Sequence, residues 1–144
     1  MQIQFTKLTP SAVAPYRGSE EAAGYDLCAT GDTYHIAIGE TVKIHTGIAI
    51  SLPAGTSGAT FARSGLATKQ GLRPANCVGV IDSDYRGEVI VTLHNDSNEF
   101  RTIEPGERIA QLVVLPYITT DFIEVDSLDE TKRGAGGFGS TGIN

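Results

Sequence analysis

The sequence predicts an all-β protein: a distorted jelly roll or β-barrel of about ten short strands, with one short helix and a flexible glycine-rich C-terminal arm. Short runs of alternating apolar and polar residues recur along the chain, and clusters of Gly, Pro, Asn and Asp separate them at regular spacing. The segment 133–142 differs, because it is half glycine and cannot build a core. We therefore expect a β-barrel domain over residues 1–127 and a mobile arm over 128–144.

The expected strands follow one another along the chain. In most of them apolar residues occupy every second position, as in a strand that buries one face. The segment 109–115 is apolar almost throughout, which predicts a strand buried on both faces, and 122–125 predicts one more. The alternating positions are Ile3 and Phe5, then Val42, Ile44, Ile48 and Ile50, then Val89, Val91 and Leu93. Turn signals between them are Thr30-Gly31-Asp32, Gly39-Glu40, Pro53-Ala54-Gly55, Asn95-Asp96-Ser97-Asn98 and Glu104-Pro105-Gly106.

One segment, 64–71, breaks this pattern and suits a single short helix. Ser64 is its expected N-cap and Gly71 its C-terminal stop. The start of such a helix presents free N–H groups and the positive end of the helix dipole, which suit an anion. An ordinary connecting turn explains the same residues, so both interpretations stay open.

The composition indicates one globular domain and limits the class of partner. The chain has 144 residues, 40% of them hydrophobic, and a formal net charge of −6. It has no basic run and no long apolar stretch, so we expect no binding to nucleic acid and no membrane span. Cys28 and Cys77 lack the spacing of a metal site and are interpreted as free thiols. Without a signal-peptide core at its start, the chain is expected to be soluble and intracellular, in cytoplasm or nucleus, of cellular or viral origin.

The arm contains a segment, 134–139, that fits the pattern G-x-G-x-x-G. A dinucleotide-binding loop must open a helix and a kinase loop must precede a large domain, and neither follows here. Arg133 can bind a phosphate through two hydrogen bonds, Phe138 offers a ring for stacking, and Ser140 adds a hydroxyl beside Gly139. These residues predict a nucleotide clamp, and the alternative is a flexible tail without function.

A polar cluster, 80–88, lies between two strand-like runs and is predicted to be a hairpin. It carries Asp82, Asp84 and Tyr85. Asp and Ser favour turns, so the cluster is explained by turn chemistry alone. A carboxylate base beside an aromatic ring explains it equally well.

Five segments in order resemble motifs of the homotrimeric dUTP pyrophosphatases. The resemblance runs from residue 22 to residue 142, and five motifs in the family order leave little room for coincidence. One departure is Ala62, where many relatives carry Pro. The segments are AGYDL (23–27), RSGL (63–66), GVIDSDYRG (79–87), GERIAQL (106–112) and RGAGGFGSTG (133–142).

The resemblance implies hydrolysis of dUTP to dUMP and pyrophosphate with Mg²⁺, by attack of water on the α-phosphorus. This reaction keeps uracil out of DNA and supplies dUMP for thymidylate synthesis. Asp82 matches the family's catalytic carboxylate, which orients and deprotonates the water, and Asp26 matches the residue that holds the hydrated metal through water. The resemblance also implies a homotrimer with sites shared between subunits, each closed by the arm of a third subunit.

The resemblance assigns substrate contacts as well. Tyr85 matches the Tyr that packs flat on the deoxyribose, where a ribose 2′-hydroxyl would clash. Phe138 is expected to stack on uracil, and Arg108 is interpreted as a structural ion-pair partner. The other expected contacts are Arg63, Ser64 and Gly65 to the phosphates, Gln111 to the α-phosphate region, Asn76 and Val80 to uracil, and Arg133, Gly139 and Ser140 from the arm.

Two other classes of protein compete with this interpretation. The dCTP deaminases share the fold, but they depart around the second and third motifs, which are intact here. A non-catalytic jelly roll, such as a capsid or regulatory binding module, would keep the strands without needing Asp82, Gln111 and Phe138 together.

Overall fold

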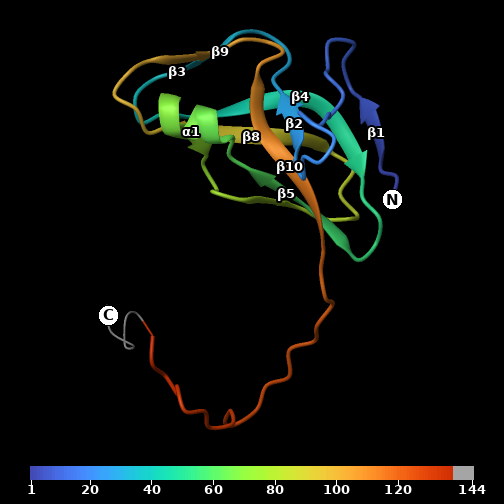
Figure 1. The fold of residues 1–144 in the computed structure, drawn as a ribbon, viewed down its shortest axis with the longest axis vertical. Helices are drawn as coiled ribbons and strands as arrows, with labels where there is room; N and C mark the ends of the chain where they lie inside the picture. The colour runs from blue at the N-terminus through green and yellow to red at the C-terminus, as the bar shows by residue number, and fades with distance from the viewer. Residues whose placement is uncertain (138–144) are drawn as a thin grey trace.

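The computed structural model describes residues 1–137, and over that range it contains ten strands and one helix. One four-stranded sheet has the order β1-β4-β8-β6, a second has the order β2-β10-β5-β7, and β3 pairs with β9 (Figure 1). The elements are β1 (Gln4–Lys7), β2 (Tyr25–Cys28), β3 (Tyr34–Ile36), β4 (Thr41–Ser51), β5 (Thr56–Phe61), α1 (Ser64–Gln70), β6 (Leu72–Pro74), β7 (Gly79–Ile81), β8 (Glu88–Asn95), β9 (Arg101–Ile103) and β10 (Arg108–Pro116).

The number of strands and the short helix are as predicted, but the described strands form separate antiparallel sheets and no closed barrel. The two larger sheets share one core. Ile44 and Leu93 enter it from the first sheet, and Leu27 and Leu112 enter it from the second. Burying one such side chain fully is worth about 1.5–3 kcal/mol, which explains why the alternating positions face inward.

The longest strand, β4, carries a bulge in the middle of its alternating pattern. Its pairing with β8 shifts register between His45 and Ala49. Gly47 lies inside this bulge with a φ of 64°, a backbone conformation that favours glycine. A β-carbon there would lie 2.8 Å from the β-carbon of Ala12, so packing excludes a side chain as well.

The helix α1 differs from the prediction at its start. Ser64 is the first helical residue, and Arg63 occupies the N-cap position in an extended conformation, without a side-chain capping bond. The predicted N-cap at Ser64 is therefore wrong by one position. The predicted stop is confirmed, because Gly71 has a φ of 69° and its N–H donates to the carbonyl of Ala67.

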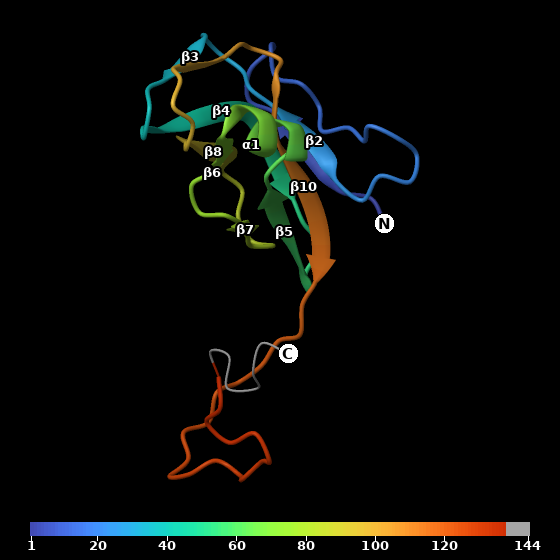
Figure 2. The same ribbon diagram turned by 60° about the vertical axis from the view of Figure 1, so that its left-hand side comes forward.

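Two predictions for the end of the chain need correction. In β10, Ile109 and Ala110 are buried, but Leu115 is exposed, so the strand is not buried on both faces along its whole length. No strand forms at 122–125: β10 ends at Pro116, and Phe122 is fully exposed. Residues 117–137 leave the end of β10 and run clear of the sheets in both views (Figures 1 and 2). A strand needs a partner for its backbone groups, and residues 122–125 pair with no strand among residues 1–137.

Cys28 is buried, Cys77 is exposed, and both are free thiols, as predicted. Within the described part of the chain, no helix has the length and apolar character needed to cross a membrane.

Candidate active site

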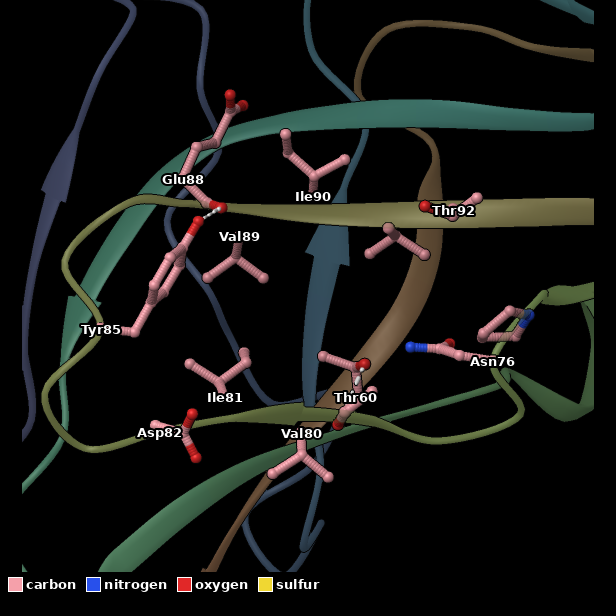
Figure 3. Close-up of a pocket in the computed structure, with 13 residues that line it drawn as sticks. Thr60, Asn76, Val80, Ile81, Asp82, Tyr85, Glu88, Val89, Ile90 and Thr92 are labelled. Carbon is pink, nitrogen blue, oxygen red and sulfur yellow. Dashed lines mark hydrogen bonds between the residues drawn. The ribbon is translucent and has the colours of Figure 1, made fainter.

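The polar cluster at 80–88 is not a hairpin. β7 pairs with β5 in the second sheet, whereas β8 pairs with β4 and β6 in the first. The six residues between them carry the chain from one sheet to the other, so the two strands diverge. The space that opens is a pocket, here called the inter-sheet pocket (Figure 3). Its lining includes Thr60, Asn76, Val80, Ile81, Asp82, Tyr85, Glu88 and Val89.

Four residues expected in the site therefore lie together, namely Asn76, Val80, Asp82 and Tyr85. The carboxylate of Asp82 is exposed and has no hydrogen bond or ion pair to any residue of 1–137, which leaves it free to act on a ligand. The main-chain carbonyl of Asp82 accepts the N–H of Tyr85 at 3.1 Å, and this bond closes the turn. The turn thus places a free carboxylate beside an aromatic ring.

The Tyr85 ring is held in a defined place. Its hydroxyl donates to the main-chain carbonyl of Glu88 at 3.0 Å (Figure 3). A β-carbon at Gly87 would collide with that hydroxyl, so only glycine allows the ring to fold back over this position. The ring remains 45% exposed and can serve as a flat packing surface.

Asn76, Gly79 and Thr60 line another part of the inter-sheet pocket. The side-chain amide of Asn76 points into it (Figure 3). A β-carbon at Gly79 would lie 3.1 Å from the Asn76 Nδ2 atom and would collide with the Thr60 hydroxyl. Glycine at this position keeps the pocket open and lets a ligand approach the backbone closely.

A second pocket lies on the opposite face of the second sheet. Neighbouring residues of a strand face opposite sides, and in β5 Thr60 lines the inter-sheet pocket while Phe61 lines the second one. Gln111 pairs in register with Phe61 on one side and with Asp26 on the other, so the three residues form a row across β5, β10 and β2. This arginine pocket is lined by residues that include Gly24, Asp26, Phe61, Arg63, Ser64, Gly65 and Gln111.

Charge in the arginine pocket is arranged around Asp26. Its Oδ1 accepts Arg63 Nε at 2.9 Å and its Oδ2 accepts Arg108 Nη1 at 3.1 Å. The ion-pair role expected for Arg108 is thereby confirmed, and the hydrogen bond and charge of Asp26 raise the pKa of the Arg108 guanidinium. Two guanidinium groups around one carboxylate leave net positive charge, which suits an anion.

A side chain of β10 supports the loop before α1 through a hydrogen bond. Gln111 Nε2 donates to the carbonyl of Ala62 at 2.9 Å. A β-carbon at Gly24 would lie 2.6 Å from the Gln111 Oε1 atom, so the glycine makes room for this side chain. Ser64 and Gly65 are exposed at the start of the helix, where backbone N–H groups lack intrahelical partners.

The two pockets share no lining residue, so one chain assembles the predicted residues into two separate groups. Arg133 lies in the arm, away from both groups, and its Nε donates to the carbonyl of Gly136 at 2.8 Å. Phe138, Gly139 and Ser140 lie outside the described residues. Sequence reasoning missed Thr60 and Glu88 in the inter-sheet pocket; Glu88 had one signal, since it directly follows the third motif.

Asp26 is the carboxylate that lines the arginine pocket. No group of three or more His, Cys, Asp or Glu side chains that could hold a metal occurs within residues 1–137. Each carboxylate oxygen of Asp26 accepts one guanidinium N–H and keeps one further acceptor position. Because the local charge is positive, Asp26 can accept hydrogen bonds from the waters of a hydrated divalent cation only when a bound anion such as a polyphosphate offsets that charge.

Jelly-roll sheets, a pocket with a free carboxylate beside an aromatic ring, and a separate arginine-lined pocket are the features of an all-β nucleotide hydrolase. The family model for dUTPase matches residues 11–142. The chain belongs to the dUTPase family.

Individual relatives agree with this assignment. The chain is 49% identical to the deoxyuridine 5′-triphosphate nucleotidohydrolase of Desulfitobacterium hafniense (strain DSM 10664 / DCB-2), over 100% of this chain and 97% of that protein. A variant dUTPase of Staphylococcus bacteriophage 80alpha with dUpNHpp has a similar structure, with a TM-score of 0.90, 29% identity and 99% of each chain covered. A variant dUTPase from phage phi11 of S. aureus, described for the coordination of a structural Mg(II) ion, gives a TM-score of 0.80 at 26% identity, over 90% of this chain and 100% of that one. The predicted fold is confirmed by these structures.

Proposed function

We propose that this chain hydrolyses dUTP to dUMP and pyrophosphate with Mg²⁺, by attack of water on the α-phosphorus. The observation that carries the proposal is the inter-sheet pocket, where the unpaired carboxylate of Asp82 lies beside the ring of Tyr85. The names of the similar proteins support the same substrate. Such an activity keeps uracil out of DNA and supplies dUMP for thymidylate synthesis.

The inter-sheet pocket accounts for selection of the nucleoside. The amide of Asn76 and the backbone around Val80 offer donors and acceptors for the edge of uracil. The ring of Tyr85 packs against the deoxyribose. A ribose 2′-hydroxyl facing this ring would lose its water without gaining a partner, at a cost of about 1–3 kcal/mol. The pocket therefore favours dUTP over UTP.

Asp82 supplies the base. Its carboxylate takes a proton from water as the water oxygen attacks the α-phosphorus, and the bond to the pyrophosphate oxygen breaks. A carboxylate is a weak base at neutral pH, so positioning of the water must contribute much of the rate. An ion pair would stabilise the charged form of an aspartate and weaken it as a base, and Asp82 has no such pair within residues 1–137.

The arginine pocket binds the phosphates. Arg63 offers its guanidinium, and the backbone of Ser64 and Gly65 offers N–H groups. When bound, Mg²⁺ neutralises charge on the phosphate oxygens. Asp26 would hold the hydrated ion through its two remaining acceptor positions. Gln111 supports the loop that carries these groups and reaches toward the α-phosphate.

We propose that a complete site is built from more than one copy of the chain. This is supported by the two pockets, which lie on opposite faces of one sheet and share no lining residue. Joining the inter-sheet pocket of one copy to the arginine pocket of the next is a head-to-tail contact, which forms a ring when the rotation between neighbouring copies closes. We propose a homotrimer, as in the family that the sequence resembles, with Arg133, Phe138, Gly139 and Ser140 of a third copy covering the substrate.

The test is pyrophosphate release from dUTP, UTP, dTTP and dCTP measured side by side, with Mg²⁺ and with excess EDTA. Turnover is expected for dUTP, with much slower release from the other three nucleotides and loss of activity in EDTA. Purified protein without dUTP turnover would refute the proposal, and release of ammonia from dCTP would favour a deaminase. Light scattering of the same sample should give three times the mass of the chain.

A further inference from the structure

Glu88 makes one set of contacts through its side-chain carboxylate and another through its main-chain carbonyl. It opens β8 beside the inter-sheet pocket, but its carboxylate points away from that pocket, on the other side of the strand (Figure 3). There Oε1 accepts the N–H of Gly47 at 2.7 Å, and Oε2 lies 2.8 Å from the Nδ1 atom of His45. Both partners belong to β4. The carboxylate therefore joins the start of β8 to β4.

This link occurs where the ordinary pairing of the two strands is interrupted. His45 pairs with Ile90, and the next pair is Ala49 with Glu88, so four steps along β4 match two steps along β8. In a regular antiparallel ladder, hydrogen-bonded backbone pairs recur at every second residue, and here side chains replace part of that pattern. The carboxylate of Glu88 holds the N–H of Gly47, and the Thr46 hydroxyl donates to the carbonyl of Val89 at 2.6 Å.

The main chain of Glu88 makes its contact on the side of β8 that faces the inter-sheet pocket. The Glu88 carbonyl accepts the hydroxyl of Tyr85 at 3.0 Å, and the ring stands over Gly87. The bulge of β4 is thus connected to the Tyr85 ring by two contacts of Glu88, one through its carboxylate and one through its main-chain carbonyl. Moving the start of β8 would move the acceptor that holds this ring.

We propose that Glu88 is a positioning residue that sets the selectivity for deoxyribose over ribose. The inference rests on the proposed function, because it assumes that Tyr85 packs on the sugar of a uridine nucleotide. With Glu88 in place, the Tyr85 ring is fixed and leaves no room for a 2′-hydroxyl. Without the carboxylate, the start of β8 loosens, the ring shifts, and the ribonucleotide is accepted more easily.

The test compares kcat/KM for dUTP with kcat/KM for UTP in four variants. In Glu88→Ala the ratio is expected to fall about tenfold, the change that corresponds to one hydrogen bond of ordinary strength. Glu88→Gln keeps an acceptor for the Gly47 N–H and should retain most of the ratio. The matched control is Glu40→Ala, since the Glu40 carboxylate also accepts a backbone N–H, that of Ala37 at 2.7 Å, and does not line the pocket. The fourth variant is Tyr85→Phe, which lacks the hydroxyl.

Combining substitutions decides whether Glu88 acts through Tyr85. In the Tyr85→Phe background the hydroxyl is already gone, so adding Glu88→Ala should leave the ratio unchanged. A further fall of the same size in the double variant would overturn the proposal. An equal loss of activity on dUTP and UTP in Glu88→Ala would also overturn it, because a merely structural role predicts no change in the ratio.

A measurement without turnover separates this inference from the proposed function. The chain has five tyrosines, so ring signals of ¹³C-labelled Tyr can be resolved, and the signal that disappears in Tyr85→Phe identifies Tyr85. Glu88→Ala is expected to shift that signal, and Glu40→Ala to leave it in place. A wild-type protein inactive on dUTP would refute the function alone. An unshifted Tyr85 signal in folded Glu88→Ala would refute the positioning role whatever the activity.

Discussion

The two pockets of one chain are built in opposite ways. The inter-sheet pocket presents groups that the protein leaves free, with Asp82 exposed and without an ion pair in the described residues. In the arginine pocket the charged groups are paired with one another, since Asp26 bonds Arg63 and Arg108 and its side chain is only 12% exposed. The first pocket is therefore suited to chemistry and the second to rigid binding.

This difference has a measurable consequence. A group with no protein partner contributes little to stability, so its substitution should change activity alone. A group that holds two arginines contributes to both, because its removal leaves charges without partners. Substitutions in the inter-sheet pocket should then change turnover alone, whereas substitutions in the arginine pocket should change both turnover and the free energy of unfolding.

The largest effect is expected for Asp82→Asn. Loss of the base should lower kcat for dUTP about 1000-fold, within the range typical of general base catalysis, while dUTP binding stays within about tenfold. The free energy of unfolding should change by less than about 0.5 kcal/mol. Stopped-flow turnover, calorimetry of dUpNHpp binding and urea unfolding measure the three quantities. Strong residual turnover would contradict the assignment of the base.

Mixing experiments extend this prediction to the assembly. Arg63→Ala should also be nearly inactive, because it removes a phosphate ligand from the arginine pocket. When Asp82→Asn and Arg63→Ala chains are unfolded and refolded together, some sites combine a normal Asp82 from one copy with a normal Arg63 from another, and activity should return. Mixed samples as inactive as either parent would show that each site belongs to one chain.

A smaller loss is expected when the arm is removed. Deleting residues 133–144 should leave a folded oligomer, since the core elements end at Pro116, but turnover should fall about 100-fold through poorer positioning of the substrate. The matched control deletes only 143–144, which lie outside the fifth motif, and should retain activity. Full activity of the longer deletion would show that the two pockets suffice without a lid.

The arginine pocket supplies the third prediction. Asp26→Asn should lower the free energy of unfolding by about 1–3 kcal/mol, because Arg63 and Arg108 lose their charged partner. The control is Asp96→Asn, which removes the surface contacts of this carboxylate with Arg73 and His94 and should cost less than about 1 kcal/mol. Urea unfolding at one fixed protein concentration measures both. Equal losses in the two variants would remove the contrast between the pockets.

Sequence patterns predicted much of the framework, whereas the candidate site residues came mainly from the family resemblance. Alternation identified the buried residues of β8, and Gly71 ended the helix where expected. The pattern could not show that the strands around Asp82 join different sheets, because strand pairing depends on distant partners and the turn residues look the same in both cases. The strand expected at 122–125 failed for the same reason, since apolar residues alone do not supply a pairing partner.

The arginine pocket was the harder one to predict from residue patterns. Arg63 lies 37 positions from Asp26, and Arg108 lies 82 positions from it, so no local spacing connects them. Only the resemblance to known enzymes indicated that these residues belong together. Register explains their proximity in the structure, because Gln111 pairs with Asp26 and with Phe61, two residues before Arg63.

The smallest predicted effect concerns the carboxyl of Glu88 and the way it makes the free energy of unfolding depend on pH. Glu88 is intermediate between the unpaired and the paired groups of the two pockets. Burial alone would raise the pKa of its carboxyl, but hydrogen bonds from His45 and from the N–H of Gly47 outweigh burial and lower the pKa below its ordinary value of 4.5. A carboxyl with a lower pKa in the folded state stabilises the protein above its unfolded pKa, and this contribution is lost as the pH falls through the folded value.

Glu88→Gln should therefore make the acid loss of stability shallower below pH 4.5, by less than about 1 kcal/mol, because the carboxylate remains partly exposed. Urea unfolding between neutral pH and the acid limit measures the difference. Glu99→Gln serves as control, since that surface carboxylate pairs only with Arg101 among the described ion pairs. Parallel curves for wild type and Glu88→Gln would mean that the carboxylate holds the bulge of β4 too weakly to fix β8. In that case no hydrogen-bonded carboxylate would support the free groups of the inter-sheet pocket. The two pockets would then differ fully in whether their charged groups are paired.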